Sequence, residues 1–161
     1  MGIVGAELWK RVEEYLDSQN WEYSAEKEIQ LDFGLDNQLE ECNMIIRFIS
    51  YGEGRFSVHT RTVCPLSVPI EKKDSISEFI TKVNYGMMDG YFSYRLLESN
   101  SAIGTLEYNC RLYCGDVLPS LDDVESSVYF PLHMMKKYGD AIFNILKHDA
   151  SPEEQIQRVE G

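Results

Sequence analysis

The chain has 161 residues, 43% of them hydrophobic and 26% charged, and its 27 acidic and 15 basic side chains give a net charge of -12. This length fits one domain with its own core. No apolar stretch approaches the roughly 20 residues that a membrane-spanning helix needs, and the negative charge argues against nucleic acid or anionic membranes as partners. The first residues lack the basic segment of a signal peptide, so we expect a soluble protein that stays in the cytoplasm.

The chain begins with a predicted helix and a predicted strand. In residues 6–18 apolar side chains such as Leu8, Val12 and Leu16 share one helical face, which predicts an amphipathic helix. From residue 21 to the turn at 36–38, polar and apolar residues alternate, and this pattern predicts a single strand over 21–35. The alternating apolar residues are Ile29, Leu31, Phe33 and Leu35.

Two further strands, over 42–51 and 55–64, flank the tripeptide Gly52-Glu53-Gly54 and predict a β-hairpin. A loop of three residues places Phe48 opposite Val58 on the core face. A loop of two residues would instead pair core-facing positions with solvent-facing ones. We therefore predict three loop residues for this hairpin.

A helix is predicted after this hairpin. Pro65 and Pro69 cannot continue a ladder of backbone hydrogen bonds. Ser75 and Glu78 form a capping box, and apolar residues then recur at helical spacing as far as Met87. We therefore expect the helix to begin at the capping box and to end near Met87.

The stretch VNYGMMDGYFSY, residues 83–94, holds two glycines, two methionines and four aromatic residues. It contains neither the GxGxxG nor the GxxxxGK pattern of a phosphate-binding loop. We therefore interpret it as the joint between the helix and a strand over 90–97, rather than as a ligand loop. A strand over 105–114 follows and completes a second hairpin.

The C-terminal part is predicted to be helical. Ser120 is a candidate N-cap for a long amphipathic helix, which Pro131 is expected to kink or split. Ser151 and Pro152 begin a short segment that is too polar to be a stable helix unless it docks. We therefore divide the chain into a single domain over 1–150 and a short helical or frayed tail over 151–161.

These elements predict an α+β fold, with an antiparallel five-stranded sheet, helices packed on one face and the order α-β-β-β-α-β-β-α. Three segments resemble the YbjN family, whose domains share the fold of type III secretion chaperones: Asp89–Arg95, Ile103–Tyr108 and the closing helix with Lys137-Tyr138 and Ile142–Ile145. The resemblance implies a small, acidic, commonly dimeric bacterial domain. It further implies that such a domain holds segments of other proteins, with no cofactor and no established catalytic residue.

Recognisable catalytic motifs are absent from the sequence. His59, His133 and His148 form no HExxH pattern, and no GxSxG motif accompanies the serines. Adjacent acids such as Glu13 and Glu14 diverge on a helix. We therefore predict no catalytic, metal-binding or cofactor-binding residue. A small enzyme with an unconventional site and a signalling regulator that binds a small ligand remain the alternatives.

The four cysteines form no CxxC pair, so the usual zinc-ribbon and thioredoxin spacings are absent. Cys110 and Cys114 would lie about 13 Å apart along one strand face, too far apart to share a metal ion. The register of the first hairpin places Cys42 opposite Cys64. We interpret all four as buried structural thiols that react slowly and stay reduced.

Arginine and aromatic side chains gather at the strand positions opposite the core face. Five of the seven arginines lie there, and Arg and Tyr dominate binding hot spots, so this face is a candidate for binding a segment of another protein. The alternative is that Glu28, Asp32 and Glu107 pair with these arginines across the strands. The candidate partner-binding residues are Ile45, Arg47, Ile49, Tyr51, His59, Arg61, Tyr91, Arg95, Arg111 and Tyr113.

From these patterns we predict a non-catalytic protein-binding domain, either chaperone-like or a regulatory adaptor. A sheet with helices on one face leaves the other face exposed, and here that face carries Ile45, Ile49 and Tyr113 among its charges. Contiguous apolar patches usually mark interfaces. We therefore expect a two-fold homodimer that uses this face, an edge strand or the second helix.

Overall fold

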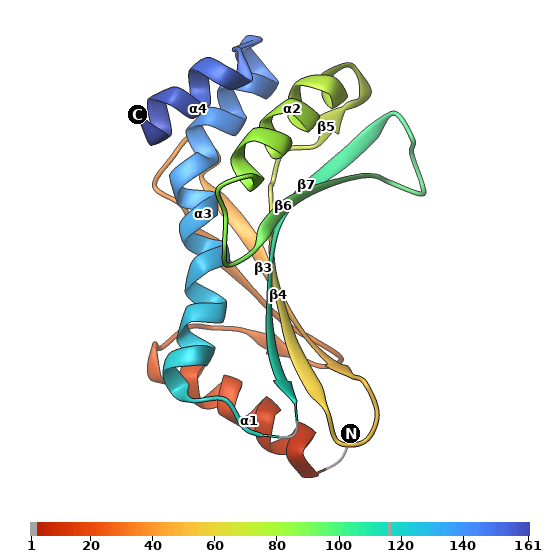
Figure 1. The fold of residues 1–161 in the computed structure, drawn as a ribbon, viewed down its shortest axis with the longest axis vertical. Coiled ribbons are helices and arrows are strands. Elements are labelled where there is room, and N and C mark those ends of the chain that lie inside the picture. The colour runs from red at the N-terminus through yellow and green to blue at the C-terminus, as the bar shows by residue number, and fades with distance from the viewer. Residues whose placement is uncertain (1–2, 116) are drawn as a thin grey trace.

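The computed structural model describes residues 3–115 and 117–161, whose helices lie on one side of a single antiparallel sheet (Figure 1). The helices are α1 (Ile3–Ser18), α2 (Lys73–Asn84), α3 (Leu121–His148) and α4 (Pro152–Glu160), and a short 3-10 helix, η1 (Ile70–Lys72), precedes α2. The strands are β1 (Ser24–Ala25), β2 (Ile29–Gly34), β3 (Glu41–Ser50), β4 (Phe56–Val63), β5 (Val68–Pro69), β6 (Tyr91–Leu96) and β7 (Ile103–Gly115). The predicted α+β class and antiparallel sheet are confirmed, but the described residues form seven strands rather than five.

One of the additional strands comes from the segment 21–35, which was predicted as a single strand. This segment folds back on itself, so that Ser24 in β1 pairs with Gln30 in β2. Residues 26–28 are all charged and give a strand no apolar side chain to hold against a core. The long strand therefore begins only at Ile29, where the apolar alternation starts.

The other additional strand, β5, forms where two prolines were expected to end the pairing. Val68 and Pro69 pair with Gly104 and Ile103 of β7, and the Val68 side chain is fully buried. A proline lacks the N–H donor but is tolerated in an edge strand, and β5 lies at the edge of the sheet. The prolines therefore limit this strand to two residues without preventing it.

The β3–β4 hairpin has the predicted loop and register. The Tyr51 N–H donates to the Arg55 carbonyl (2.9 Å) and thereby encloses Gly52-Glu53-Gly54. All three loop residues have positive φ angles, 80°, 53° and 72°, which glycine adopts most easily. Phe48 pairs with Val58 as predicted.

β7 is the longest strand and organises the sheet. β4 and β5 lie end to end along one edge of β7, and β6 lies along the other edge. Figure 1 shows that the β6–β7 turn projects away from the helices, while the β3–β4 turn lies at the other end of the sheet, near the start of α1. The helix-free side of the sheet lies between these two turns (Figure 1).

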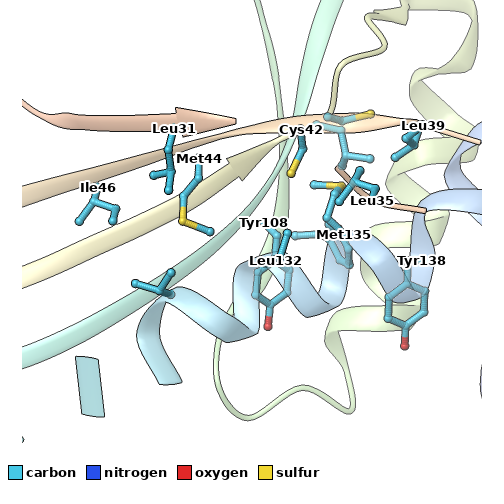
Figure 2. Packing of buried hydrophobic residues seen from close by; sticks show 14 of the residues in the cluster. Leu31, Leu35, Leu39, Cys42, Met44, Ile46, Tyr108, Leu132, Met135 and Tyr138 are labelled. Atoms are coloured by element: carbon cyan, nitrogen blue, oxygen red, sulfur yellow. The ribbon is translucent and has the colours of Figure 1, made fainter. Parts of the chain in front are cut away.

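The core lies between the sheet and the helices. Figure 2 shows Cys42, Met44 and Ile46 of β3 pointing toward α3, which carries Leu132 and Met135. All five side chains are buried, and full burial of a large aliphatic side chain contributes about 1.5–3 kcal/mol. This layer holds α3 against the middle of the sheet.

A cluster of four aromatic rings forms the second part of the core. Phe79 of α2, Phe92 of β6, Tyr108 of β7 and Tyr138 of α3 have ring centroids 4.9–5.9 Å apart in edge-to-face arrangements. Such pairs contribute roughly 0.5–1.5 kcal/mol beyond the area that they bury. The cluster therefore ties α2 and α3 to the β6–β7 hairpin.

The predicted start of α2 is wrong. η1 leads directly into α2, so the helix begins at Lys73 and Ser75 is its third residue rather than its cap. No side chain caps this helix, because the preceding 3-10 turn continues into it. α2 also ends at Asn84, before Met87, and residues 85–90 connect it to β6.

α3 begins as predicted and continues through its proline. The Ser120 hydroxyl accepts a hydrogen bond from the Asp123 N–H (3.1 Å), and the Asp123 carboxylate accepts one from the Ser120 N–H (3.4 Å). Pro131 does not split the helix. Side chains before and after it, such as Val128 and Leu132, are buried against the sheet, and this packing outweighs the missing backbone hydrogen bond.

The tail over 151–161 forms α4, which docks on α3 and α2. Pro152 and Gln155 are buried, and the Tyr138 hydroxyl donates to the Glu160 carboxylate (2.5 Å). A nine-residue polar helix is not stable alone in water. Docking therefore accounts for its order.

Candidate partner-binding surface

The candidate site is the face of the sheet that none of the described helices covers, and we call it the outer face. It consists of the strand side chains that alternate with core residues. Strand pairing arranges the candidate residues in neighbouring rows: Ile49–Ser57–Tyr113, Arg47–His59–Arg111 and Ile45–Arg61–Asn109–Tyr91. Tyr51 lies beside Tyr113, with ring centroids 6.0 Å apart, and Arg95 reaches over from β6. The sequence therefore placed these residues correctly on one face.

Four of the five arginines assigned to the outer face have a carboxylate partner: Arg55 pairs with Glu53 in the adjacent turn, and the other three pair across the sheet. Arg47 Nε lies 2.5 Å from a Glu28 oxygen. Glu107 is only 5% exposed, and its oxygens lie 3.4 Å from Arg61 and 3.5 Å from Arg95. Cross-strand pairing, the alternative explanation for these arginines, is therefore present at all three.

Arg111 and His59 differ from these three arginines. Among the described residues, no carboxylate oxygen lies within 4.0 Å of Arg111 or of His59. Asp32, the third acid predicted to pair here, accepts a hydrogen bond from Asn43 instead (3.0 Å). Burial, and then the positive charge of Arg111, lower the pKa of His59 below its ordinary value of 6.5. Arg111 is thus a cation that lacks a partner within the described part of the chain.

A hollow of about 440 Å³ lies on the outer face. Ile45 and Val63 contribute apolar surface to it, and the charged residues that line it are Asp32, Glu41, Arg61, Arg95 and Glu107. The Arg61 Nε is buried, and within residues 3–115 and 117–161 no hydrogen-bond acceptor reaches it. An acceptor on a bound molecule would relieve the free-energy cost of that unpaired N–H.

Three tyrosine rings border the outer face and stay accessible. Tyr113 is 59% exposed, Tyr91 50% and Tyr51 44%. Tyrosine offers a large contact area together with a polar hydroxyl, which suits it to protein interfaces. Together with Arg111, these rings give the β7 end of the outer face the composition of a binding hot spot.

The histidines do not converge on one site. His59 is on β4, whereas His133 and His148 are on α3, where His133 stacks on Tyr129 (5.3 Å between centroids). In the part of the chain that the structure describes, no group of three or more His, Cys, Asp or Glu side chains could hold a metal ion. None of the described helices is long and apolar enough to cross a membrane.

The cysteines lie on the core side of the strands, as predicted. Cys42, Cys64 and Cys110 are buried and Cys114 is half-buried, and all four are free thiols. Burial raises the pKa of Cys42 to about 12 and those of Cys64 and Cys110 to about 11, from an ordinary value of 9.0. Burial also raises the pKa of Cys114. A thiol with a raised pKa forms little of the reactive thiolate at neutral pH.

One feature next to this surface was not predicted from the sequence, which is the unequal length of β6 and β7. β6 has six residues and β7 has 13, so part of β7 has no neighbour on the β6 side. The signal was present in the sequence, because the strand expected over 105–114 was already longer than the one expected over 90–97. The part of β7 that has no neighbour on the β6 side follows from that difference in length.

The sequence matches no protein-family model and none of the curated proteins. The structure is similar to the crystal structure of YbjN, a putative transcription regulator from E. coli, with a TM-score of 0.56 and 10% sequence identity. The similarity covers 81% of this chain and 90% of that chain. It confirms the predicted resemblance to YbjN at the level of the fold.

Proposed function

We propose that this chain is a non-catalytic protein-binding domain, which holds a segment of another protein at the β7 end of the outer face. The observation that carries the proposal is the position of Arg111, a cation without a carboxylate partner among the described residues. It lies in the row next to Tyr113, whose ring is more than half exposed. In a chain with a net charge of -12, this combination suits an acidic or aromatic segment.

The test uses the purified chain, immobilised, to retain proteins from an extract of the native cell. Arg111→Glu and Tyr113→Glu change the proposed surface, while Arg158→Glu changes an exposed arginine of α4 and serves as the control. We expect at least one protein that the unmodified chain and the control both retain and that both surface variants lose. The proposal fails if the retained proteins are the same for all variants, provided that circular dichroism shows each variant to be folded.

We also propose that the chain forms a two-fold homodimer. Ile45 and Ile49 are half-buried on the outer face, and Tyr85, at the end of α2, is 96% exposed, so both surfaces offer apolar contact. If the outer face is used, Ile49→Glu and Tyr113→Glu weaken association in sedimentation experiments, whereas Tyr85→Glu does not. The reverse result places the interface at α2. A dimer held by about 7 kcal/mol of association free energy or more would be detected at tens of micromolar, so a monomer at that concentration rules the dimer out.

A further inference from the structure

β7 has different neighbours along its two edges. On one edge it pairs with β4 from Glu107 to Gly115. On the other edge it pairs with β6 only from Gly104 to Asn109. Residues 110–115 therefore have no strand beside them on the β6 side within the described part of the chain, and we call this stretch the open edge.

The backbone direction at the open edge follows from the hydrogen bonds of its continuation. Cys64 N–H donates to Leu106 C=O, so the backbone polar groups of the even-numbered residues of β7 point toward β4. Leu97 N–H donates to Ile103 C=O, so those of the odd-numbered residues point toward β6. In an antiparallel ladder the N–H and C=O of one residue point to the same side, and successive residues alternate. The N–H and C=O groups of Arg111 and Tyr113 therefore point out of the open edge. Such a row of unpaired groups is a template for another strand.

The described chain that precedes β6 forms no ladder with the open edge, since β6 pairing begins at Tyr91 and Asn109. Gly90 has a φ of 149°, and a Cβ at this position would lie 2.3 Å from the Asn109 carbonyl oxygen, so the backbone lies close against β7 at this point. The Asn84 side chain bonds to both the N–H and the C=O of Phe92 (2.8 Å each) and so ties the start of β6 to the end of α2. The residues between Asn84 and Phe92 are therefore held close to the end of α2.

A cavity of about 430 Å³ adjoins the open edge. Cys110 and Leu112 line it from β7, and Ser127 and Phe130 line it from α3. Met88, on the approach to β6, also lines it and is 94% exposed. A strand added to the open edge would therefore place every second side chain in this cavity on the helix side of the sheet, which Met88, Leu112 and Phe130 line together with polar and charged residues.

The two sides of such a strand would meet different charges. On the outer side the nearest charged group is Arg111, which has no carboxylate partner among the described residues. The cavity is lined by Asp89 and Asp123, and Arg111 itself also borders it; Asp123 already caps α3. Acidic side chains are therefore favoured beside Arg111 and disfavoured next to Asp89 and Asp123.

We infer that the open edge receives an extended segment of a partner protein as an added β-strand. The segment carries an acidic residue beside Arg111, and apolar or hydroxyl side chains alternate with it toward the cavity. Backbone hydrogen bonds to Arg111 and Tyr113 supply affinity, and the alternating side chains supply specificity. The inference rests on the proposed function, since the ligand is again a protein segment, and it defines where and in which conformation that segment binds.

A second copy of the chain fits this edge less well. Two β7 strands that paired here would bring residues 110–115 together, and this stretch, Cys-Arg-Leu-Tyr-Cys-Gly, contains no acid. Arg111 would stay without a counter-ion in such a pair. Charge complementarity therefore favours a partner segment that brings its own carboxylate.

Amide hydrogen exchange of the free protein, followed by NMR, tests whether the edge is open. We expect the Arg111 and Tyr113 amides to exchange quickly and the Leu112 amide, which points toward β4, to be protected. Protection of Arg111 and Tyr113 that grows with protein concentration would show that a second copy occupies the edge. Protection at every concentration would show that the edge is closed. Either result overturns the inference.

Binding is tested with a phage-displayed library of random eight-residue peptides, selected on the full chain. The best-enriched peptide is then synthesised, and its Kd is measured by calorimetry for the unmodified chain, Tyr113→Pro and Tyr113→Ala. Both substitutions remove the tyrosine ring, but only proline also removes the N–H, which points out of the sheet at a position where proline is tolerated. Arg111→Pro and Arg111→Ala form a second matched pair, which is used if Tyr113→Pro does not fold.

We expect enriched peptides to alternate between acidic and apolar residues. We also expect the proline variant to bind about tenfold more weakly than the alanine variant, because one partner carbonyl loses its donor. Equal binding by the two variants, or no enrichment, overturns the strand-addition site. If the peptide is instead lost in Arg111→Glu but not in the proline variants, the protein-binding function stands and only the added strand is rejected.

Discussion

The two faces of the β3–β4 hairpin are built from alternate residues of the same strands but differ in what covers them. On the helix side, Met44 and Ile46 are completely buried, and α3 packs over them. On the outer face, Ile45 is half-buried and Arg47 is exposed. In β3, alternation therefore separates core from surface, because only one face has helices on it.

β7 does not follow this rule, and the exception divides the outer face into two zones. Glu107 and Asn109 point to the outer face, yet each is only 5% exposed. Arg61 and Arg95 cover Glu107, and the Asn109 amide donates to the Ser93 hydroxyl (2.7 Å). One zone is thus closed by polar side chains that satisfy one another, whereas the zone around Arg111 and Tyr113 stays accessible.

The largest expected effect comes from the contrast between adjacent residues of β3. We expect Ile46→Ala to lower the free energy of unfolding by about 2–5 kcal/mol, because it leaves a cavity beneath α3. Ile45→Ala, one position away on the other face, is expected to lower it by less than about 1 kcal/mol. Urea unfolding of both variants measures the difference. Equal losses would contradict the assignment of the two faces.

The closed polar zone is tested by removing the charge of its central carboxylate. Glu107→Gln should lower the free energy of unfolding by about 1–3 kcal/mol, since it leaves the mostly buried Arg61 without its ion pair. Glu28→Gln removes the more accessible partner of Arg47 and should cost less than about 1 kcal/mol. Denaturant titrations at low and high salt provide the measurement. A larger loss for Glu28→Gln than for Glu107→Gln would refute this division of the outer face.

The sequence predicted these faces well where the pattern was local. The loop of Gly52-Glu53-Gly54 and the alternation around it determine the β3–β4 register, and the pairing of Phe48 with Val58 agrees. The N-cap at Ser120 was also readable, because a capping box involves residues only three positions apart. Features set by neighbouring residues were therefore predictable.

Features that depend on distant parts of the chain were not predictable. Ser75 has the signature of a helix cap, but η1 starts the helix earlier, and no local pattern reveals that turn. The sequence placed the ten candidate residues on one face. It could not show that Arg61 and Arg95 share Glu107 while Arg111 has no such partner, because side chains from three different strands decide this. The division of the outer face therefore emerged only from the fold.

The helix side of the sheet also predicts a response to alkaline pH. The raised pKa values of Cys42 (about 12) and Cys64 (about 11) mean that the unfolded chain loses these protons first, near the ordinary value of 9.0. The stability associated with the protonated thiols is therefore present below pH 9 and is lost as pH rises toward these higher values. Urea unfolding under reducing conditions at several pH values should show this decline. Cys42→Ala should make the decline shallower, and an unchanged slope would contradict it.

Thiol labelling compares the same cysteines kinetically. A water-soluble reagent at neutral pH should modify the half-buried Cys114 first, while Cys42, Cys64 and Cys110 react only as fast as the structure opens. Mass spectrometry of the labelled protein over time gives the order. Rapid modification of all four thiols in the native state would contradict their burial and would bring a redox role back into consideration.

The smallest expected effect is a shift in the pKa of His59, which lies next to Arg111 in the accessible zone of the outer face. Burial and the charge of Arg111 lower its pKa below 6.5, so the unfolded chain takes up this proton first as the pH falls. The stability associated with the neutral imidazole is therefore present above pH 6.5 and is lost as pH falls through the folded-state pKa. In an NMR titration, Arg111→Ala should raise the midpoint of His59 toward its ordinary value but not restore it fully, because burial is the larger cause. Arg158→Ala should leave the midpoint unchanged, and an unchanged midpoint in Arg111→Ala would show that the two side chains do not interact.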